Sequence, residues 1–212
     1  ESVGLYDISS FGKFEISGIG TLSTLQRLSC ANIDVEVGKV VYTQWLNDRG
    51  GIEADLTIAR LEEDRFWIIT GIGSLNRDWW RLKHHLEPDV KLTDLTMSYA
   101  CLALQGPNSR DLLQPMIESD LTSEAFNFGT GKFSKLNGKT VWIQRLSYVG
   151  ELGWEIFVPS ESAIKVLKDI QLAGKAFDLS NVGLHAVNSL RLEKGFCHWG
   201  HDIGTEDNLH QA

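Results

Sequence analysis

Paired strand-forming segments around short turns constrain this 212-residue chain more than any other feature. Residues 39–46 (KVVYTQWL) and 52–61 (IEADLTIARL) are rich in β-branched and aromatic side chains, which favour extended backbone. Between them lies NDRGG at 47–51, a run of turn-forming residues. This arrangement predicts a β-hairpin.

Two further hairpins are predicted in the second half of the chain. The pair Asn137-Gly138 is the strongest short turn signal, and it joins residues 132–136 to 139–146. The third hairpin runs from residues 140–149 to 154–158 through the four-residue turn GELG.

Apolar residues with helical spacing separate the strand signals. Ser160 is a candidate N-cap for one of these segments, and Gly195 is a stop signal after the last. We expect helices at 21–28, 75–86, 108–116, 161–172 and 184–194. Strand pairs interleaved with helices predict an α+β fold with mainly antiparallel sheets.

Composition excludes several classes of function. The net charge of −8 and the lack of a basic run argue against a nucleic-acid binder. No segment is long and apolar enough to cross a membrane. The three cysteines, Cys30, Cys101 and Cys197, are far apart and form no CxxC pair. We therefore expect no metal site and a reducing compartment, cytoplasmic or, in a eukaryote, the mitochondrial matrix.

Hairpin arithmetic places tyrosines beside carboxylates, because residue numbers directly opposite in an antiparallel pair add to a constant. With Asp48-Arg49 at the tip of the first turn, Tyr42 faces Asp55, and Thr57 shares their face. In the third hairpin the same argument pairs Tyr148 with Glu155. A shift of one residue in either register would break these pairs.

Asp55 is the most informative of these residues. It lies among Ala54, Leu56 and Ile58, where an unpaired buried carboxylate would be costly. The alternative is that acidic strand residues simply face water, and on strand position alone the two readings are about equal. A carboxylate can accept two donors at once, and the 2-amino group and adjacent ring N–H of a pterin form such an edge.

Other motifs indicate structure rather than chemistry. His84-His85 are adjacent on a helix, point in different directions and are expected at the surface. The HWGHD segment at 198–202 is read as a loop or strand that lines a pocket or has a structural role. Gly71-Ile72-Gly73 lacks the third glycine of a dinucleotide fingerprint and is expected to be a turn. Cys101 and Cys197 are expected to be buried and inert.

Residues 145–156 (RLSYVGELGWEI) closely resemble the glycine-cleavage T-protein, or aminomethyltransferase, family. Segments 4–9 (GLYDIS), 50–55 (GGIEAD) and 189–195 (SLRLEKG) resemble it in the same order and spacing. The sequence at 147–154 and 198–202 is most similar to the folate-binding domain of dimethylglycine and sarcosine dehydrogenases.

The resemblance implies an aminomethyltransferase-type folate-binding domain over residues 1–212. It implies that Asp55 is the essential aspartate beside the reactive folate nitrogens and that Glu155 holds the pterin. Tyr42, Thr57 and Tyr148 match pocket positions. The implied cofactor is tetrahydrofolate, and the implied partners are an N-methyl amine-derived iminium and a flavin domain or subunit that carries FAD separately.

The chain also departs from the family. Where glycine-cleavage members carry Ala-Arg-Asp, whose arginine meets the folate tail, this chain has Ala186-Val187-Asn188. The family's terminal barrel domain and any flavin domain lie outside these residues, so we expect an incomplete part of the enzyme. The expected reaction is capture of the carbon of an oxidised dimethylglycine- or sarcosine-type amine, giving 5,10-methylenetetrahydrofolate. Two alternatives are a non-catalytic folate-binding regulatory module and a folate-dependent demethylase of another methyl donor.

Overall fold

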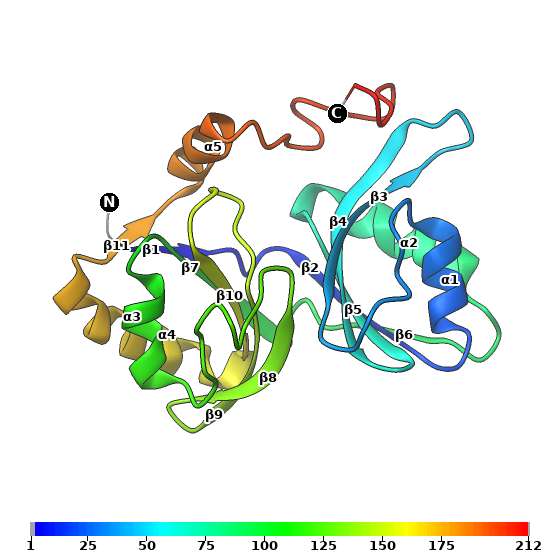
Figure 1. Ribbon diagram of the computed structural model, residues 1–212. Coiled ribbons are helices and arrows are strands. Elements are labelled where there is room, and N and C mark those ends of the chain that lie inside the picture. Colours follow the sequence, from blue (N-terminus) through cyan, green and yellow to red (C-terminus); the bar gives the residue numbers. More distant parts are fainter. Residues whose placement is uncertain (1–2, 212) are drawn as a thin grey trace. The chain divides into compact units, whose positions relative to one another are not determined.

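The computed structural model describes residues 3–211 (Figure 1). Residues 1, 2 and 212 of the expected domain lie outside this range. The chain divides into two compact units, one formed by residues 3–10 and 97–196 and the other by 11–96 and 197–211. Each unit has its own sheet and core, and the two are treated in turn.

The first unit contains a six-stranded sheet in the order β11-β1-β7-β10-β9-β8. All neighbours are antiparallel except the parallel pair β1–β11. The strands are β1 (Gly4–Asp7), β7 (Tyr99–Gln105), β8 (Gly131–Leu136), β9 (Lys139–Gln144), β10 (Gly153–Pro159) and β11 (Ser180–Val182). The helices are α3 (Ser109–Leu113), η2 (Gln114–Met116), α4 (Ser160–Gly174), η3 (Lys175–Phe177) and α5 (Leu184–Glu193).

One face of this sheet packs against α3 and α4 (Figure 1). Leu112 on α3 and Val166 on α4 join Trp154 and Ile156 of β10 in a single buried cluster. Because side chains alternate along a strand, Glu155 points to the opposite face of the sheet. A smaller cluster of Tyr6, Ala103 and Val149 lies on that second face, with α5 residues against it.

The second unit contains a five-stranded antiparallel sheet in the order β3-β4-β5-β2-β6. Its strands are β2 (Gly12–Ser17), β3 (Val40–Leu46), β4 (Ile52–Glu62), β5 (Arg65–Thr70) and β6 (Lys91–Asp94), and its helices are α1 (Thr21–Leu28), η1 (Ile72–Ser74) and α2 (Leu75–His85). Helices α1 and α2 lie against one face of this sheet (Figure 1). Leu25 of α1 and Leu82 of α2 bury that face together with Leu56 and Ile58 of β4. Asp55 therefore lies on the face away from these helices.

These elements confirm the α+β prediction with mainly antiparallel sheets. All five expected helical segments form within two residues of their predicted bounds, the third continuing as the 3₁₀ turn η2. Asn137 and Gly138 both have positive φ, 45° and 77°, as the predicted two-residue turn requires. The Ser160 cap is wrong: Pro159 is the N-cap, and the Ser160 hydroxyl donates to Met97 O at 2.7 Å.

The remaining structural predictions have mixed outcomes. His84 and His85 are exposed as expected, each with Nδ1 hydrogen-bonded to the backbone carbonyl four residues earlier. Residues 71–73 form a turn into η1. Cys101 is buried, but Cys197 is only half-buried. No helix within residues 3–211 is long and apolar enough to span a membrane.

Candidate functional site

Asp55 lies in the first half of β4, and its partner on β3 is not the predicted one. Gln44 is directly opposite Asp55, and Tyr42 is opposite Thr57. The predicted direct pair between Tyr42 and Asp55 is therefore wrong by two residues. A shift of two preserves the face, so Tyr42, Gln44, Asp55 and Thr57 all lie on the side away from α1 and α2.

Two separate one-residue changes produce this shift. Asn47 Oδ1 accepts hydrogen bonds from the backbone N–H groups of Arg49 and Gly51, both at 2.9 Å, so the turn is centred on Arg49. A β-bulge then inserts Glu53, because Leu46 pairs with Ile52 whereas Trp45 pairs with Ala54. Either change alone would have moved Asp55 to the helix-covered face. Together they leave its orientation as predicted.

The Asp55 carboxylate is part of a small polar chain on this face. The Tyr42 hydroxyl hydrogen-bonds to Asp55, and Gln44 hydrogen-bonds to Tyr42. Burial raises the pKa of Asp55 above its ordinary value, and the hydrogen bond from Tyr42 opposes that rise. The pKa of Tyr42 is also raised, first by burial of its hydroxyl and then by the Asp55 charge, although 57% of its surface is exposed. Asp55 is thus a half-buried carboxylate that holds a proton more readily than usual.

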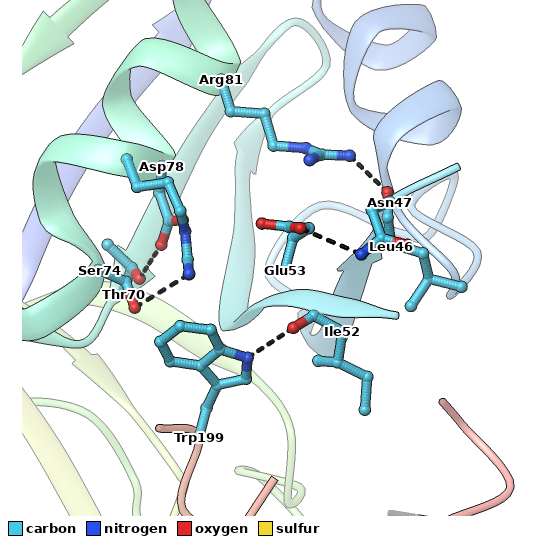
Figure 2. A network of polar contacts seen from close by, with 10 residues as sticks. Leu46, Asn47, Ile52, Glu53, Thr70, Ser74, Asp78, Arg81 and Trp199 are labelled. Atoms are coloured by element: carbon cyan, nitrogen blue, oxygen red, sulfur yellow. Dashed lines mark hydrogen bonds and ion pairs between the residues drawn. The ribbon is translucent and has the colours of Figure 1, made fainter. Parts of the chain in front are cut away.

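Side chains from α2 and the C-terminal segment hold the turn end of this hairpin (Figure 2). Arg81 of α2 donates to the carbonyl of Leu46, and the Trp199 indole N–H donates to the carbonyl of Ile52 at 2.7 Å. The Arg77 guanidinium lies 4.0 Å above the Trp199 ring. These contacts hold the ends of β3 and β4 next to the turn, and Asp55 follows on β4 shortly after this anchored end.

The C-terminal segment also pairs with the turn itself. Gly51 forms an antiparallel bridge with Asn208, and Ile52 N–H donates to Asp207 O at 2.9 Å. A Cβ on Gly51 would lie 1.9 Å from the Thr205 carbonyl oxygen. Only glycine allows this close approach of two backbones.

Gly51→Ala is therefore expected to lower the free energy of unfolding by about 1–3 kcal/mol, the usual cost of overpacking. Gly71→Ala is the matched control, because its φ is −64° and no atom lies within 4 Å of the added Cβ. Urea unfolding of the full-length protein measures both variants. Equal midpoints for the two would show that the segment 205–208 does not constrain the turn.

Glu155 belongs to the first unit, on the face of its sheet opposite α3 and α4. Gln144 of β9 is directly opposite it, and Gln144 Nε2 donates to Glu155 Oε2 at 2.7 Å. Burial raises the pKa of Glu155, and the hydrogen bond from Gln144 opposes that rise. On the other side, Ala103 of β7 is the cross-strand neighbour of Glu155.

Tyr148 is not paired with Glu155 as predicted. Strand β9 ends at Gln144, and residues 145–152 form a loop before β10. Ser147 Oγ accepts hydrogen bonds from the N–H groups of Val149 and Glu151, which curls the chain out of the strand direction. Within this loop the Tyr148 ring stacks on Phe196, with centroids 6.2 Å apart and planes 16° from parallel.

The remaining motifs contribute structure. Asp202 accepts a hydrogen bond from the backbone N–H of His198, and the His198 and His201 rings lie 5.5 Å apart in a turn region, as expected. No metal-binding group of His, Cys, Asp or Glu occurs among the residues that the structure describes. Val187 packs against the cluster of Tyr6 and Ala103.

The structure adds residues that sequence reasoning missed. Gln44 and Gln144 each lie directly across from a candidate carboxylate. Gln144 ends the apolar run Val141-Trp142-Ile143 and is fully buried, which is the same signal that distinguished Asp55. Asp55 in the second unit and Glu155 in the first are thus carboxylates that neutral side chains orient and that can accept further donors. Asp78, which is also buried, differs from them because it bonds both Thr70 and the Arg77 guanidinium.

Residues 1–212 match the GCVT N-terminal domain family, and the chain belongs to that family. It is 39% identical over its whole length to 4-methylaminobutanoate oxidase (formaldehyde-forming) of Paenarthrobacter nicotinovorans and covers 26% of that protein. It is 34% identical, again over its whole length, to the mitochondrial sarcosine dehydrogenase of Homo sapiens and covers 25% of it.

The fold matches a solved structure of the same kind. The glycine cleavage system aminomethyltransferase T from Bartonella henselae superimposes with a TM-score of 0.86 at 29% identity, over 98% of this chain and 55% of that one. The resemblance to aminomethyltransferases and to dehydrogenases of N-methylated amino acids is thus confirmed. The chain spans about a quarter of the two enzymes and about half of the solved structure.

Proposed function

We propose that this chain binds tetrahydrofolate and transfers to it the carbon of an oxidised N-methyl amine, giving 5,10-methylenetetrahydrofolate. The observation that carries the proposal is the pair of desolvated carboxylates, Asp55 and Glu155, in a chain of the GCVT family. Asp55 points away from α1 and α2, Glu155 points away from α3 and α4, and each accepts a hydrogen bond from a neutral side chain. Neither has a cation as its principal partner.

Glu155 is proposed to hold the pterin. Its Oε2 accepts one hydrogen bond from Gln144, and no residue in 3–211 donates to Oε1. A carboxylate has about four lone-pair positions, so it can still accept the 2-amino group and the neighbouring ring N–H of a pterin. The free acceptor positions of Glu155 therefore fit the hydrogen-bond donors of a reduced folate. Tyr148, on the loop that precedes β10, is proposed to contribute an aromatic wall.

Asp55 is proposed to act on protons at the reactive nitrogens, with Tyr42 and Thr57 lining the same face. When one folate nitrogen attacks the iminium carbon, the C=N π electrons pass to the amine nitrogen and Asp55 accepts the proton that the folate nitrogen releases. The second folate nitrogen then bonds to the same carbon, and the amine leaves with the electrons of its C–N bond and a proton. The raised pKa of Asp55 suits this role, because a base is most effective when its pKa approaches the working pH. Tyr42 keeps the carboxylate oriented through its hydroxyl.

The source of the carbon is proposed from the related enzymes. A dimethylglycine- or sarcosine-type amine would be oxidised to an iminium by a flavin domain or subunit that carries FAD outside these residues. The sarcosine dehydrogenase and the formaldehyde-forming oxidase that align over the whole chain support this choice. Each would release a carbon at the oxidation level of formaldehyde, which is the level of a methylene bridge.

Calorimetric titration of the full-length protein tests the proposal. We expect saturable heat with tetrahydrofolate and none with NAD, because the chain has no dinucleotide fingerprint. Heat with NAD and none with tetrahydrofolate would contradict it. Mass spectrometry of the folate after turnover identifies the reaction: 5,10-methylenetetrahydrofolate supports the proposal, 5-methyltetrahydrofolate indicates a demethylase, and unmodified folate indicates a regulatory module.

A further inference from the structure

The Glu155 carboxylate is the end of a chain of hydrogen bonds that begins at a tryptophan. Trp142 Nε1 donates to Gln144 Oε1 at 3.0 Å, and Gln144 Nε2 donates to Glu155 Oε2 at 2.7 Å. Trp142 and Gln144 are successive residues on one face of β9, and Gln144 is the cross-strand partner of Glu155. Only 2% of Trp142 and 0% of Gln144 is exposed, so water does not compete for these bonds.

The direction of this chain is determined by the indole. An amide has a donor end and an acceptor end, whereas the indole N–H can only donate. Gln144 must therefore turn Oε1 towards Trp142 and Nε2 towards Glu155. The reverse orientation would place two N–H donors together and a carbonyl oxygen against the carboxylate, at the cost of two buried hydrogen bonds.

We propose that Gln144 is a positioning residue that holds Glu155 in the orientation that receives the pterin, and that Trp142 fixes the orientation of Gln144. This inference rests on the proposed function of Glu155. With Oε2 held by Gln144, the carboxylate is directed towards β9, and both oxygens keep lone pairs for the ligand. Gln144 touches no reacting atom, so its effect is on binding and not on the chemical step.

The energetic need for such a residue is visible around Glu155. Burial favours the neutral carboxyl, which could accept fewer donors, and Gln144 is the hydrogen-bond partner that favours the ionised form. The titratable side chains that the strands place on the same sheet face are Tyr6 of β1, Tyr99 and Cys101 of β7, and Lys135 of β8. None of them is a cause of the pKa shift of Glu155. Gln144 thus stabilises the ionised form of Glu155 through a hydrogen bond, without bringing a charge of its own.

The experiment is a double-mutant cycle on the full-length protein, read by tetrahydrofolate titration and by the rate at saturating folate. Gln144→Met keeps length and apolar volume but removes the donor. We expect a roughly tenfold higher dissociation constant, as for loss of a hydrogen bond to a charged group, and a nearly unchanged saturated rate. Trp142→Phe should act in the same direction, by roughly threefold, because Gln144 loses its orienting partner.

The cycle separates positioning from general destabilisation. In a Glu155→Gln background, Gln144→Met should lower the affinity no further, because the carboxylate that Gln144 orients is gone. Gln114→Met is the control. This glutamine also uses both ends of its amide, but its partners are the backbone groups Ser119 O and Leu121 N and it lies in η2, so its loss should leave folate affinity unchanged.

The possible results distinguish the positioning role of Gln144, the binding role of Glu155 and the proposed function. Wild-type affinity in both Gln144→Met and Trp142→Phe, or independent effects of Gln144→Met and Glu155→Gln, would overturn the positioning role. A Glu155→Gln variant with normal affinity would instead remove Glu155 from the proposed site. Lack of folate binding by the wild-type protein would overturn the proposed function itself. If Gln144→Met fails to fold, Trp142→Phe carries the test.

Discussion

Asp55→Asn is expected to bind tetrahydrofolate but to lose about 10²-fold or more of the rate at saturating folate. Asparagine keeps the size of the side chain and can still accept a hydrogen bond from Tyr42, so the face of β4 should stay intact. It cannot take up a proton. The measurement is formation of 5,10-methylenetetrahydrofolate by the full-length protein together with its oxidising domain.

The pH dependence gives this prediction a second readout. A base works in its deprotonated form, so the wild-type rate should rise with pH through the pKa of Asp55, which burial places above the ordinary aspartate value. The Asn variant should lack this rise. Glu62→Gln, an exposed carboxylate at the far end of the same strand, is the control. A wild-type saturated rate in Asp55→Asn would leave Asp55 as a binding residue only.

Local sequence patterns predicted the helices and turns well, because the formation of each helix or turn depends mainly on residues close to it in the sequence. The Asn137-Gly138 turn and the spacing of Leu25 and Leu28 in α1 are examples. The arrangement of the sheets was not predictable in this way. Strand β7 pairs with both β1 and β10, and β1 pairs with β11 from residues more than 170 positions later. No short-range pattern specifies such pairings.

The candidate residues show the same division between local and non-local information. An acidic residue in an apolar strand identified Asp55, but its true neighbour Gln44 depended on a turn centred on Arg49 and a bulge at Glu53. For Glu155, the predicted turn of four residues is a loop of eight, stabilised by Ser147. Side-chain hydrogen bonds to the backbone decide both registers, and residue types alone do not reveal them.

Glu155→Gln is expected to weaken tetrahydrofolate binding by about ten- to a hundredfold. A carboxylate can accept both pterin donors, whereas an amide has one acceptor atom and places an N–H group against the other donor. Hydrogen bonds to charged groups contribute about 1.5–3 kcal/mol, which corresponds to that range of affinity.

The local structure makes this substitution more disruptive than the loss of one bond. Gln144 Nε2 already donates to Glu155, so the new amide must also turn its oxygen towards Gln144. Its NH₂ group then points to the position where the pterin donors are proposed to lie, and donor meets donor. Titration of the full-length variant measures the effect, with Glu161→Gln, in the first turn of α4, as the control. Unchanged affinity in Glu155→Gln would mean that the pterin is held elsewhere and that the buried carboxylate serves only the packing of β9 against β10.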